Sequence, residues 1–327
     1  MLFISRDEIK SFLTMPDVIR AVEDGFRQYA LGNVLMPVRS TIVCDRYKGA
    51  MLTMPAYIGG AVDAIGQKVV TVYPTNPERN LPTILATIQL LDPKTGTPLA
   101  IMDGAFVTAM RTGAVSAVAT KYLARKDAST LTVFGAGVQA ETQLIAIANV
   151  RKLESAKVFD IDRKRAKEFS ERLSSSLGIR VEVTDDPEAA VRDSMIIACA
   201  TTSKTPIFNG QWLREGAHIN GIGSHFGPGT KEIDGTAVKR ARVIVDSKEA
   251  CLKEAGDLID PIKDGLISED HIVAELGEVI IGKKKGRLAE DEITFFKSVG
   301  LALQDISTAN LVYQTALKRG IGTQLEL

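Results

Sequence analysis

Residues 131–140 constrain the fold of this chain more than any other segment. Leu131-Thr132-Val133-Phe134 is an apolar run typical of a buried strand, and a helical pattern follows Gly135-Ala136-Gly137. In this G-x-G-x-x-A pattern Gly135 permits a tight turn, Gly137 lets a ligand approach the backbone, and Ala140 allows close packing of helix on strand. The N-terminus of such a helix presents N–H groups and a positive dipole end to phosphates. The segment therefore predicts the start of a Rossmann unit that binds a dinucleotide; a glycine turn without a ligand is the alternative.

The next predicted strand, Lys157–Asp160, ends in an acidic residue. Asp160 lies 25 positions after Gly135, close to the spacing of about 20 that is typical of dinucleotide-binding units. A carboxylate at this place can bind both ribose hydroxyls and would repel a 2′-phosphate, so NAD is favoured over NADP. Arg163 and Lys164 follow closely and keep NADP as the alternative.

Strand and helix alternate after Lys126, which predicts a parallel sheet covered on both faces. Its strands are expected at Leu131–Phe134, Lys157–Asp160, Arg180–Val183, Met195–Ala198, His218–Gly221 and Arg242–Val245. Beyond Asp246 the sequence becomes polar and helical and ends in a long helix, Ser298–Leu317. A return of this helix to the first part of the chain would make the first domain discontinuous.

The part of the chain before this alternation has a different pattern. β-rich runs separated by turn signals indicate an antiparallel α+β block, with strands at Arg39–Val43, Gly49–Met54, Gln67–Tyr73 and Thr83–Leu91. Ser5 and Glu8 have the spacing of a capping box at the start of a first helix. Further helices are expected over about 15–32 and 103–124.

The composition excludes several classes of protein. A length of 327 residues suggests about two domains, and a hydrophobic share of 45% is typical of a soluble globular protein. The formal net charge of zero argues against a protein that holds nucleic acid by charge. The N-terminal residues lack a signal-peptide pattern, and no stretch resembles a membrane span. We therefore expect a cytoplasmic protein with no nucleic-acid or membrane partner, and the spacing of its histidines predicts no metal site.

Lys68 is a single charge in the apolar strand Lys68–Tyr73. It shares a face with Val70 and Val72 by the two-residue period of a strand. If that face is the core, burial lowers the pKa of the lysine and suits it to proton transfer near neutral pH. A lysine at the edge of the strand, in solvent, is the alternative.

Arg111 is the only charged residue between Asp103 and Lys121. A solitary guanidinium on a helix of small residues invites an anion, either a substrate carboxylate or a cofactor phosphate. A buried structural salt bridge is the alternative. Arg39 opens a strand and is a weaker candidate for the same role, whereas Asp305, the sole charge in Ser298–Leu317, favours a structural role.

His225 lies in the glycine-rich segment 221–229, directly after the predicted strand His218–Gly221. Ligands bind beyond the carboxyl ends of the strands in open parallel sheets, so this loop, with Ile222 and Gly223, is a candidate site. His225 is therefore a candidate for proton transfer, and capping of the turn is the alternative.

With these residues identified, the chain resembles the ornithine cyclodeaminase/μ-crystallin family over nearly its whole length. The most specific likeness is an Arg-Thr-Gly-Ala helix joined to G-x-G-x-Q-A. The matching motifs are Met36-Pro37-Val38-Arg39, Gly66-Gln67-Lys68, Leu81-Pro82-Thr83, Asp103-Gly104, Arg111-Thr112-Gly113-Ala114, Gly135-Ala136-Gly137-Val138-Gln139-Ala140 and Ser298-Val299-Gly300.

The resemblance implies an α/β protein with two domains and a homodimeric assembly. Residues 1–118 with 303–327 would form an α+β substrate-binding and dimerisation domain, and residues 119–302 a Rossmann-type NAD-binding domain. Arg39 and Lys68 would hold the substrate, with Lys68 also placed for acid–base chemistry, and Val299 would border it. Dinucleotide contacts are implied for Thr83, Arg111, Val138, Gln139, Asp160, Thr201 and Ser298.

One departure from the family pattern bears on the reaction. Cyclodeaminases and the archaeal alanine dehydrogenase carry an aspartate in the loop after the fifth Rossmann strand, in a pattern like Gly-x-Asp. Here residues 223–228 read Gly-Ser-His-Phe-Gly-Pro, one residue longer, with His225 nearest the missing aspartate. The segment Gly49–Tyr57 also carries no acid to bind a second amino group.

These observations lead to three hypotheses. The leading one is an NAD-dependent oxidoreductase that acts on the Cα–N bond of a small amino acid or its imine, as an alanine dehydrogenase or imine reductase does. The second is an ornithine cyclodeaminase, which releases proline and ammonia with no net NADH. The third is a non-catalytic binder of dinucleotide or small ligand, as μ-crystallin suggests.

Overall fold

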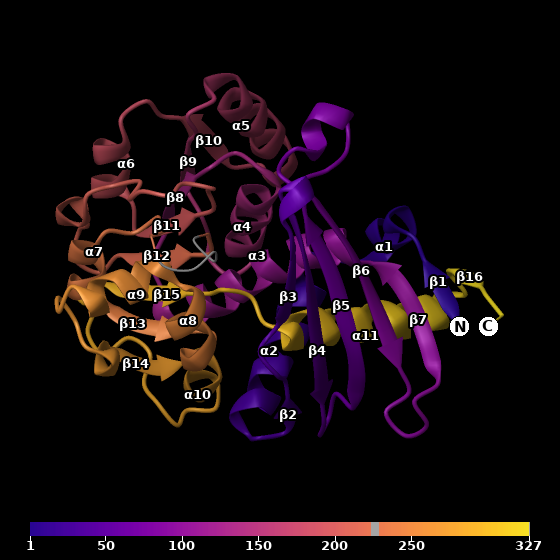
Figure 1. Ribbon diagram of the computed structural model, residues 1–327. Coiled ribbons are helices and arrows are strands. Elements are labelled where there is room, and N and C mark those ends of the chain that lie inside the picture. Colours follow the sequence, from indigo (N-terminus) through magenta and orange to yellow (C-terminus); the bar gives the residue numbers. More distant parts are fainter. Residues whose placement is uncertain (224–228, 327) are drawn as a thin grey trace. The chain divides into compact units, whose positions relative to one another are not determined.

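The computed structural model describes residues 1–223 and 229–326 (Figure 1). Its backbone divides into two compact units, Met1–Arg111 with Leu301–Leu327, and Thr112–Gly300. The sequence-based boundaries were 118/119 and 302/303, a few residues from these. The difference at the first boundary arises inside one continuous helix, α3 (Gly104–Leu123), which contributes residues to both units.

The first unit is built on a mixed eight-stranded sheet with the order β16-β1-β7-β6-β5-β4-β2, in which β3 also pairs with β4. Strands β2 to β7 pair antiparallel, as the β-rich runs separated by turn signals predict, whereas β1 runs parallel to β7. The strands are β1 (Leu2–Ile4), β2 (Val34–Leu35), β3 (Ser40–Cys44), β4 (Gly49–Ile58), β5 (Ala64–Val72), β6 (Ile84–Leu91), β7 (Pro98–Asp103) and β16 (Thr323–Gln324).

Three helices complete this unit: α1 (Arg6–Phe12), α2 (Met15–Ala30) and α11 (Ala302–Arg319). The capping box at Ser5 and Glu8 is present as predicted. α11 comes from the far end of the chain and packs against α2 and the central strands β4, β5 and β6 (Figure 1). Most of the first half of α11 is buried, so its one acid, Asp305, lies inside this unit.

The second unit contains a fully parallel eight-stranded sheet with the order β10-β9-β8-β11-β12-β15-β13-β14. The chain reverses its direction of winding between β8 and β11, which is the place where such sheets bind ligands. The strands are β8 (Thr130–Phe134), β9 (Ser155–Phe159), β10 (Arg180–Val183), β11 (Ile196–Cys199), β12 (His218–Gly221), β13 (Arg242–Val245), β14 (Ile272–Glu275) and β15 (Thr294–Lys297).

Six predicted strands of this sheet are confirmed within two residues, but β14 and β15 were missed. β15 lies between β12 and β13, in the middle of one half of the sheet. It consists of the four residues Thr294–Lys297 and closely follows the charged residues Glu290, Asp291 and Glu292, so its pattern does not stand out. The last helix begins at Ala302 rather than at Ser298, because residues 298–300 are held by Asp246 at the end of β13.

Seven further helices belong to the second unit as described. They are α4 (Val138–Ala148), α5 (Arg163–Leu177), α6 (Pro187–Asp193), α7 (Gly235–Arg240), α8 (Lys248–Glu254), α9 (Gly256–Lys263) and α10 (Leu276–Ile280). Apolar side chains of α4 and α5, such as Leu144 and Phe169, form one core with Leu131, Val133 and Val158 of the neighbouring strands. No helix within 1–223 and 229–326 is long and apolar enough to cross a membrane.

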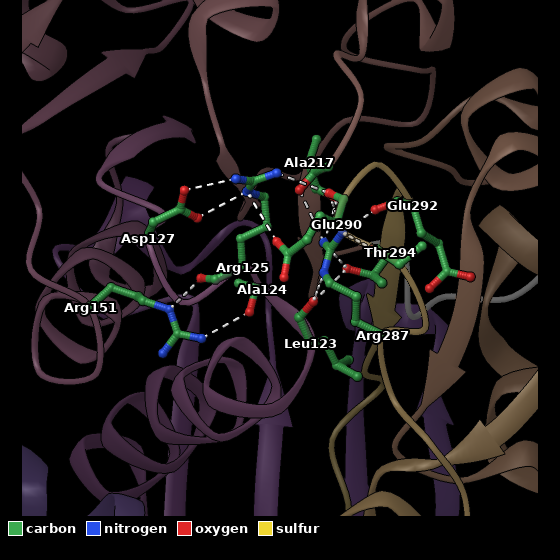
Figure 2. Close-up of polar contacts among 12 residues, drawn as sticks. Leu123, Ala124, Arg125, Asp127, Arg151, Ala217, Arg287, Glu290, Glu292 and Thr294 are labelled. Atoms are coloured by element: carbon green, nitrogen blue, oxygen red, sulfur yellow. Dashed lines mark hydrogen bonds and ion pairs between the residues drawn. The ribbon is translucent and has the colours of Figure 1, made fainter.

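Arginine side chains close the C-terminal end of α3 (Figure 2). Arg151 donates to the carbonyls of Thr120 and Ala124 at 2.8 and 3.0 Å, and Arg287 donates to that of Leu123 at 2.8 Å. The last carbonyls of a helix have no partner within the helix, and cations are favourable at that end. This arginine cluster therefore anchors α3 to the second unit, at the edge of the sheet opposite the carboxyl ends of its strands.

Candidate active site

The glycine turn after β8 has the geometry that an anion site requires. Gly135 has a φ of +100°, and a Cβ at this residue would lie 2.6 Å from the carbonyl oxygen of Ala200, so the position needs glycine. Gly137 is the N-cap of α4 and provides no side-chain cap. A Cβ at Gly137 would meet nothing within 4 Å. The first N–H groups of α4 thus have no side-chain cap and face open space, where a phosphate could accept their hydrogen bonds.

Asp160 is positioned directly beside this turn. It follows β9, which ends one residue earlier than predicted, at Phe159. Its Oδ2 accepts a hydrogen bond from the Ala136 N–H at 2.7 Å, and its Oδ1 accepts one from the Asp162 N–H at 2.8 Å. These bonds fix the carboxylate, and each oxygen retains acceptor capacity for a ribose hydroxyl. Arg163, which kept NADP as the alternative, forms an exposed ion pair with Asp185 at 2.5 Å.

The strand register brings the predicted cofactor residues of the second unit to one edge. Phe159, Phe134, Cys199, Gly221 and Lys297 are aligned across five neighbouring strands. The residues that follow them therefore lie at the same carboxyl-terminal edge of the sheet. They include Gly135, Gly137, Val138, Gln139, Asp160, Arg163, Thr201, Ile222, Gly223 and Ser298.

Two buried carboxylates at this edge were missed in the sequence. Glu232 accepts hydrogen bonds from the Thr201 N–H, the Thr201 hydroxyl and the Gly223 N–H at 2.6, 2.7 and 2.8 Å. Asp246 accepts from the Ser298 hydroxyl and the Val299 N–H at 2.7 and 2.9 Å. Asp246 follows an apolar strand, as Asp160 does, so the same signal could have identified it. Glu232 lies in a polar loop with no such pattern.

In the first unit, Lys68 is buried rather than at a solvent-exposed edge. It belongs to β5, and 1% of its surface is exposed. Its Nζ donates to Asp305 Oδ2 at 2.7 Å. Burial lowers the pKa of Lys68 to about 7, and nearby Arg111 and Arg39 lower it as well, whereas Asp305 raises it. Lys68 thus faces the core rather than solvent, and its role in proton transfer stays a prediction.

Arg111 contacts the same carboxylate from α3. Its Nε donates to Asp305 Oδ1 at 2.9 Å, and one terminal nitrogen donates to Gln304 Oε1 at 2.8 Å. The buried salt bridge that was the alternative for Arg111 is therefore present. A guanidinium carries five N–H donors, and these two bonds use two of them. Asp305 bridges Lys68 and Arg111, so its role is electrostatic as well as structural.

The remaining candidates lie in both units. Arg39 is half-buried in the segment before β3 and contributes to the electrostatic field at Lys68. Thr83 precedes β6, where its carbonyl accepts from the Tyr73 N–H at 2.9 Å. Val299 is buried in the second unit. His225 lies outside the described residues.

His218 is a buried histidine that the sequence did not single out as a candidate. It is fully buried in β12, and its Nδ1 lies 2.9 Å from the Thr294 hydroxyl. Burial lowers the pKa of His218 to about 3, with a further contribution from Arg287 and Arg151. The residue is neutral at physiological pH and serves the packing of the sheet.

The second unit fits a dinucleotide on several independent grounds. The first N–H groups of α4 have no side-chain cap and can bind an anion. The Asp160 carboxylate is held in place by two backbone N–H groups and can accept hydrogen bonds from two ribose hydroxyls. Ile161 is 99% exposed and offers apolar surface to a base. Gln139 Oε1 is buried and has no hydrogen-bond partner within the described part of the chain. A ligand with phosphates, ribose hydroxyls and a flat ring would satisfy these groups together.

Comparison with known proteins agrees with this geometry. The model of the ornithine cyclodeaminase/mu-crystallin family matches residues 1–320. A Delta(1)-pyrroline-2-carboxylate reductase from Bacillus cereus is 39% identical over 327 residues and is aligned over 100% of both chains.

Two solved structures have the same fold throughout. Delta(1)-pyrroline-2-carboxylate reductase of Thermococcus litoralis, in complex with NADH and L-proline, is 47% identical with a TM-score of 0.96, over 99% of this chain and 100% of that one. An archaeal alanine dehydrogenase dimer with bound NAD is 37% identical with a TM-score of 0.94, over 100% and 99%. The resemblance drawn from the motifs is confirmed: the chain belongs to the ornithine cyclodeaminase/mu-crystallin family.

Proposed function

We propose that this protein is an NAD-dependent oxidoreductase that reduces a small cyclic imine bearing a carboxylate, or oxidises the corresponding amino acid. The observation that carries the proposal is the buried cluster of Lys68, Arg111 and Asp305. It combines a lysine whose pKa is about 7 with a guanidinium suited to a carboxylate. Two relatives with the described fold and sequence are Delta(1)-pyrroline-2-carboxylate reductases.

The charge around Lys68 favours an anionic substrate. The charged groups that act on the pKa of Lys68 are one carboxylate, Asp305, and two guanidiniums, Arg111 and Arg39. With Lys68 protonated, two cations, Lys68 and Arg111, share the one carboxylate of Asp305, so positive charge exceeds negative charge among these three groups. A substrate carboxylate would balance it, and a guanidinium binds a carboxylate with two parallel hydrogen bonds. Arg39 and Arg111 are thus proposed to orient the substrate through its carboxylate.

Lys68 is proposed to move the proton at the substrate nitrogen. A pKa near 7 lets the lysine donate a proton to the amine as it forms and accept one in the reverse direction. Asp305 holds the Nζ at 2.7 Å and so keeps the lysine in one place. His225 remains a candidate for a second proton transfer.

The dinucleotide is proposed to bind at the carboxyl-terminal edge of the parallel sheet. The turn at Gly135 and Gly137 would hold its phosphates, Asp160 its adenosine ribose, and Thr201, Gly223 and Ser298 the remainder. Val138, 67% exposed at the first turn of α4, would cover it. When bound, the cofactor supplies or accepts the hydride at the carbon of the C–N bond.

The neighbours of Lys68 disfavour a diamino acid substrate. Met54 on β4 and Ile88 on β6 are its cross-strand partners, and both are buried on the same face. Neither is an acid that could bind a second ammonium group, consistent with the absence of acids in Gly49–Tyr57. The apolar neighbours favour a small aliphatic side chain or ring, so net reduction or oxidation is expected rather than cyclodeamination.

A substrate screen followed at the NADH absorbance band tests this function. Δ1-pyrroline-2-carboxylate should consume NADH, and L-proline with NAD should produce it. L-alanine with NAD tests the alternative represented by the archaeal alanine dehydrogenase. Ornithine converted to proline and ammonia with no net NADH would contradict the proposal, as would tight NADH binding without turnover of any amino acid or imine.

We further propose that the first unit mediates a homodimer. Large apolar side chains remain exposed on two strands of its sheet, Ile42 and Val43 on β3 and Ile84 and Leu85 on β6. Exposed apolar patches of this kind are typical of protein interfaces. The archaeal alanine dehydrogenase relative is a dimer. Sedimentation of the full chain should give twice the mass of one chain, and Val43→Glu should shift it toward the monomer.

A further inference from the structure

Glu232 joins the ends of two strands that flank the proposed cofactor site. Its Oε1 accepts from the backbone and the hydroxyl of Thr201, just beyond β11, and its Oε2 accepts from the N–H of Gly223, just beyond β12. The carboxylate is fully buried and lies on a different segment from either strand. It therefore fixes the spacing between two loops that lie beyond Cys199 and Gly221, the last paired residues of β11 and β12.

A second pair of charges holds this carboxylate in place. Asp257 Oδ1 accepts from the N–H groups of Glu232 and Ile233 at 2.8 and 2.9 Å. Its Oδ2 forms an ion pair with Lys297 Nζ at 2.5 Å. Lys297 is the last residue of β15 and is also fully buried. Buried charges are costly unless they are paired or hydrogen-bonded; here Lys297 and Asp257 form an ion pair, and Glu232 accepts three hydrogen bonds.

Gly223 is held on both sides of its backbone. Its N–H donates to Glu232, and its carbonyl accepts from Lys297 Nζ. A Cβ at this residue would overlap the Glu232 carboxylate, so the close approach requires glycine. Two ionic side chains, Glu232 and Lys297, thus meet at one glycine at the ligand-binding edge.

From this arrangement we infer that Glu232 is a positioning residue for the dinucleotide: with Lys297 and Asp257 it fixes Thr201 and Gly223 in the conformation that binds the nicotinamide half of the cofactor. The inference rests on the proposed function, because it assumes that a dinucleotide binds at this edge. Glu232 acts through the backbone of these two residues and does not itself contact the reacting atoms. A preformed site loses affinity when its supporting groups are removed, even if its shape is nearly retained.

The matched variants Glu232→Gln and Asp234→Asn test the inference. Glutamine keeps the size of the side chain but replaces one carboxylate oxygen with an NH2 group. This donor would face the donors of either Thr201 or Gly223, so the hydrogen bonds on that side are lost. Asp234 lies two residues away and caps α7, accepting from Ala237 and Gly210 at 2.7 and 2.9 Å, with no bond to Thr201 or Gly223. Both changes lower thermal stability, so stability alone does not distinguish them.

The discriminating measurement is the dissociation constant for NADH, followed by its fluorescence without substrate. E232Q should bind NADH about tenfold more weakly than the unmodified chain, because a hydrogen bond to a charged acceptor is lost. D234N should keep the unmodified affinity. Equal NADH affinity in all three proteins would overturn the inference, since Glu232 would then be structural only. An unmodified chain that binds no NADH would overturn the proposed function as well.

Thr201→Val and Thr201→Ser provide a milder pair should E232Q fail to fold. Valine keeps the shape of threonine but loses the hydroxyl that donates to Glu232, whereas serine keeps that hydroxyl. Hydrogen exchange of the peptide containing Gly223, measured without cofactor, should accelerate in T201V and stay unchanged in T201S. Identical exchange in both would show that Thr201 and Gly223 are not coupled through Glu232.

Discussion

Asp305→Asn changes one charge in the buried cluster and should move the pH dependence of the reaction. The carboxylate lies 2.7 Å from Lys68 Nζ and stabilises its protonated form, so it raises the pKa of Lys68 against the effect of burial. Asparagine keeps a hydrogen-bond acceptor but removes the negative charge. The pKa of Lys68 should therefore fall below its present value of about 7.

The size of the shift follows from the distance. At the 2.7 Å between Nζ and Oδ2, two unit charges interact by about 6 kcal/mol at an effective dielectric constant of about 20. One pKa unit corresponds to about 1.4 kcal/mol, so about four units is the upper end. Opposite charges in contact typically shift a pKa by about 1–3 units, and we expect the inflection of the pH profile to move down by this amount.

Rates in both directions give the assay. In amino-acid oxidation Lys68 must be neutral, so the rise in kcat/KM near pH 7 should occur at lower pH in D305N. In imine reduction Lys68 must be protonated, so the fall in kcat/KM should also occur at lower pH. Asp103→Asn is the control, because Asp103 pairs with Arg6 at 3.0 Å and is not among the charged groups that shift the pKa of Lys68. A D305N protein that binds NADH but keeps the original inflection in both directions would refute the assignment of the titration to Lys68.

Three further predictions concern single residues. Lys68→Ala should lower kcat by at least about 100-fold while NADH binding is retained, and an active variant would remove lysine from the mechanism. Asp160→Ala should reduce the preference for NAD over NADP by about tenfold, measured as the ratio of the two kcat/KM values, because a fixed acceptor for the ribose hydroxyls is lost; an unchanged ratio would exclude this role. His218→Gln should reduce acid sensitivity. The pKa of His218 is about 3 in the folded state and near 6.5 when unfolded, so the unfolded state binds the extra proton between these values. As the pH falls from 6.5 toward 3, the free energy of unfolding of the unmodified chain should therefore decrease by about 1.4 kcal/mol per pH unit relative to that of H218Q. Urea unfolding at a series of pH values measures this difference.

The fold of the second unit was predictable where apolar strands stand out between helices. Four-residue strands such as β10 and β12 could be located because turns bound them on both sides. β15 could not, because its place between β12 and β13 depends on pairing with strands that precede it in the sequence by about 50 residues or more. Sequence periodicity reports local structure and carries no information on which strands become neighbours.

The candidate site shows the same division. Lys68 and Arg111 stand out because a lone charge in an apolar segment requires a partner, and Asp160 because an acid follows a buried strand. The partner of Lys68 lies 237 positions away, so Asp305 could be recognised as unusual but not assigned to it. Glu232 lies among polar residues in a loop, where nothing in the sequence distinguishes a buried carboxylate from a solvated one.

The contribution of α11 to the first unit has a consequence for synthesis of the chain. Residues 1–111 leave the ribosome first, but their sheet lacks the helix that covers β4, β5 and β6 until residues 302–319 have been made. Domains generally fold as units during synthesis, the N-terminal one first. In this chain the sheet of the first unit can be covered only after residues 302–319 have been made, and Lys68 can meet the Asp305 carboxylate only then. A chain that stops short of Asp305 lacks this counter-charge, so the lysine acquires the surroundings that set its pKa only late in synthesis.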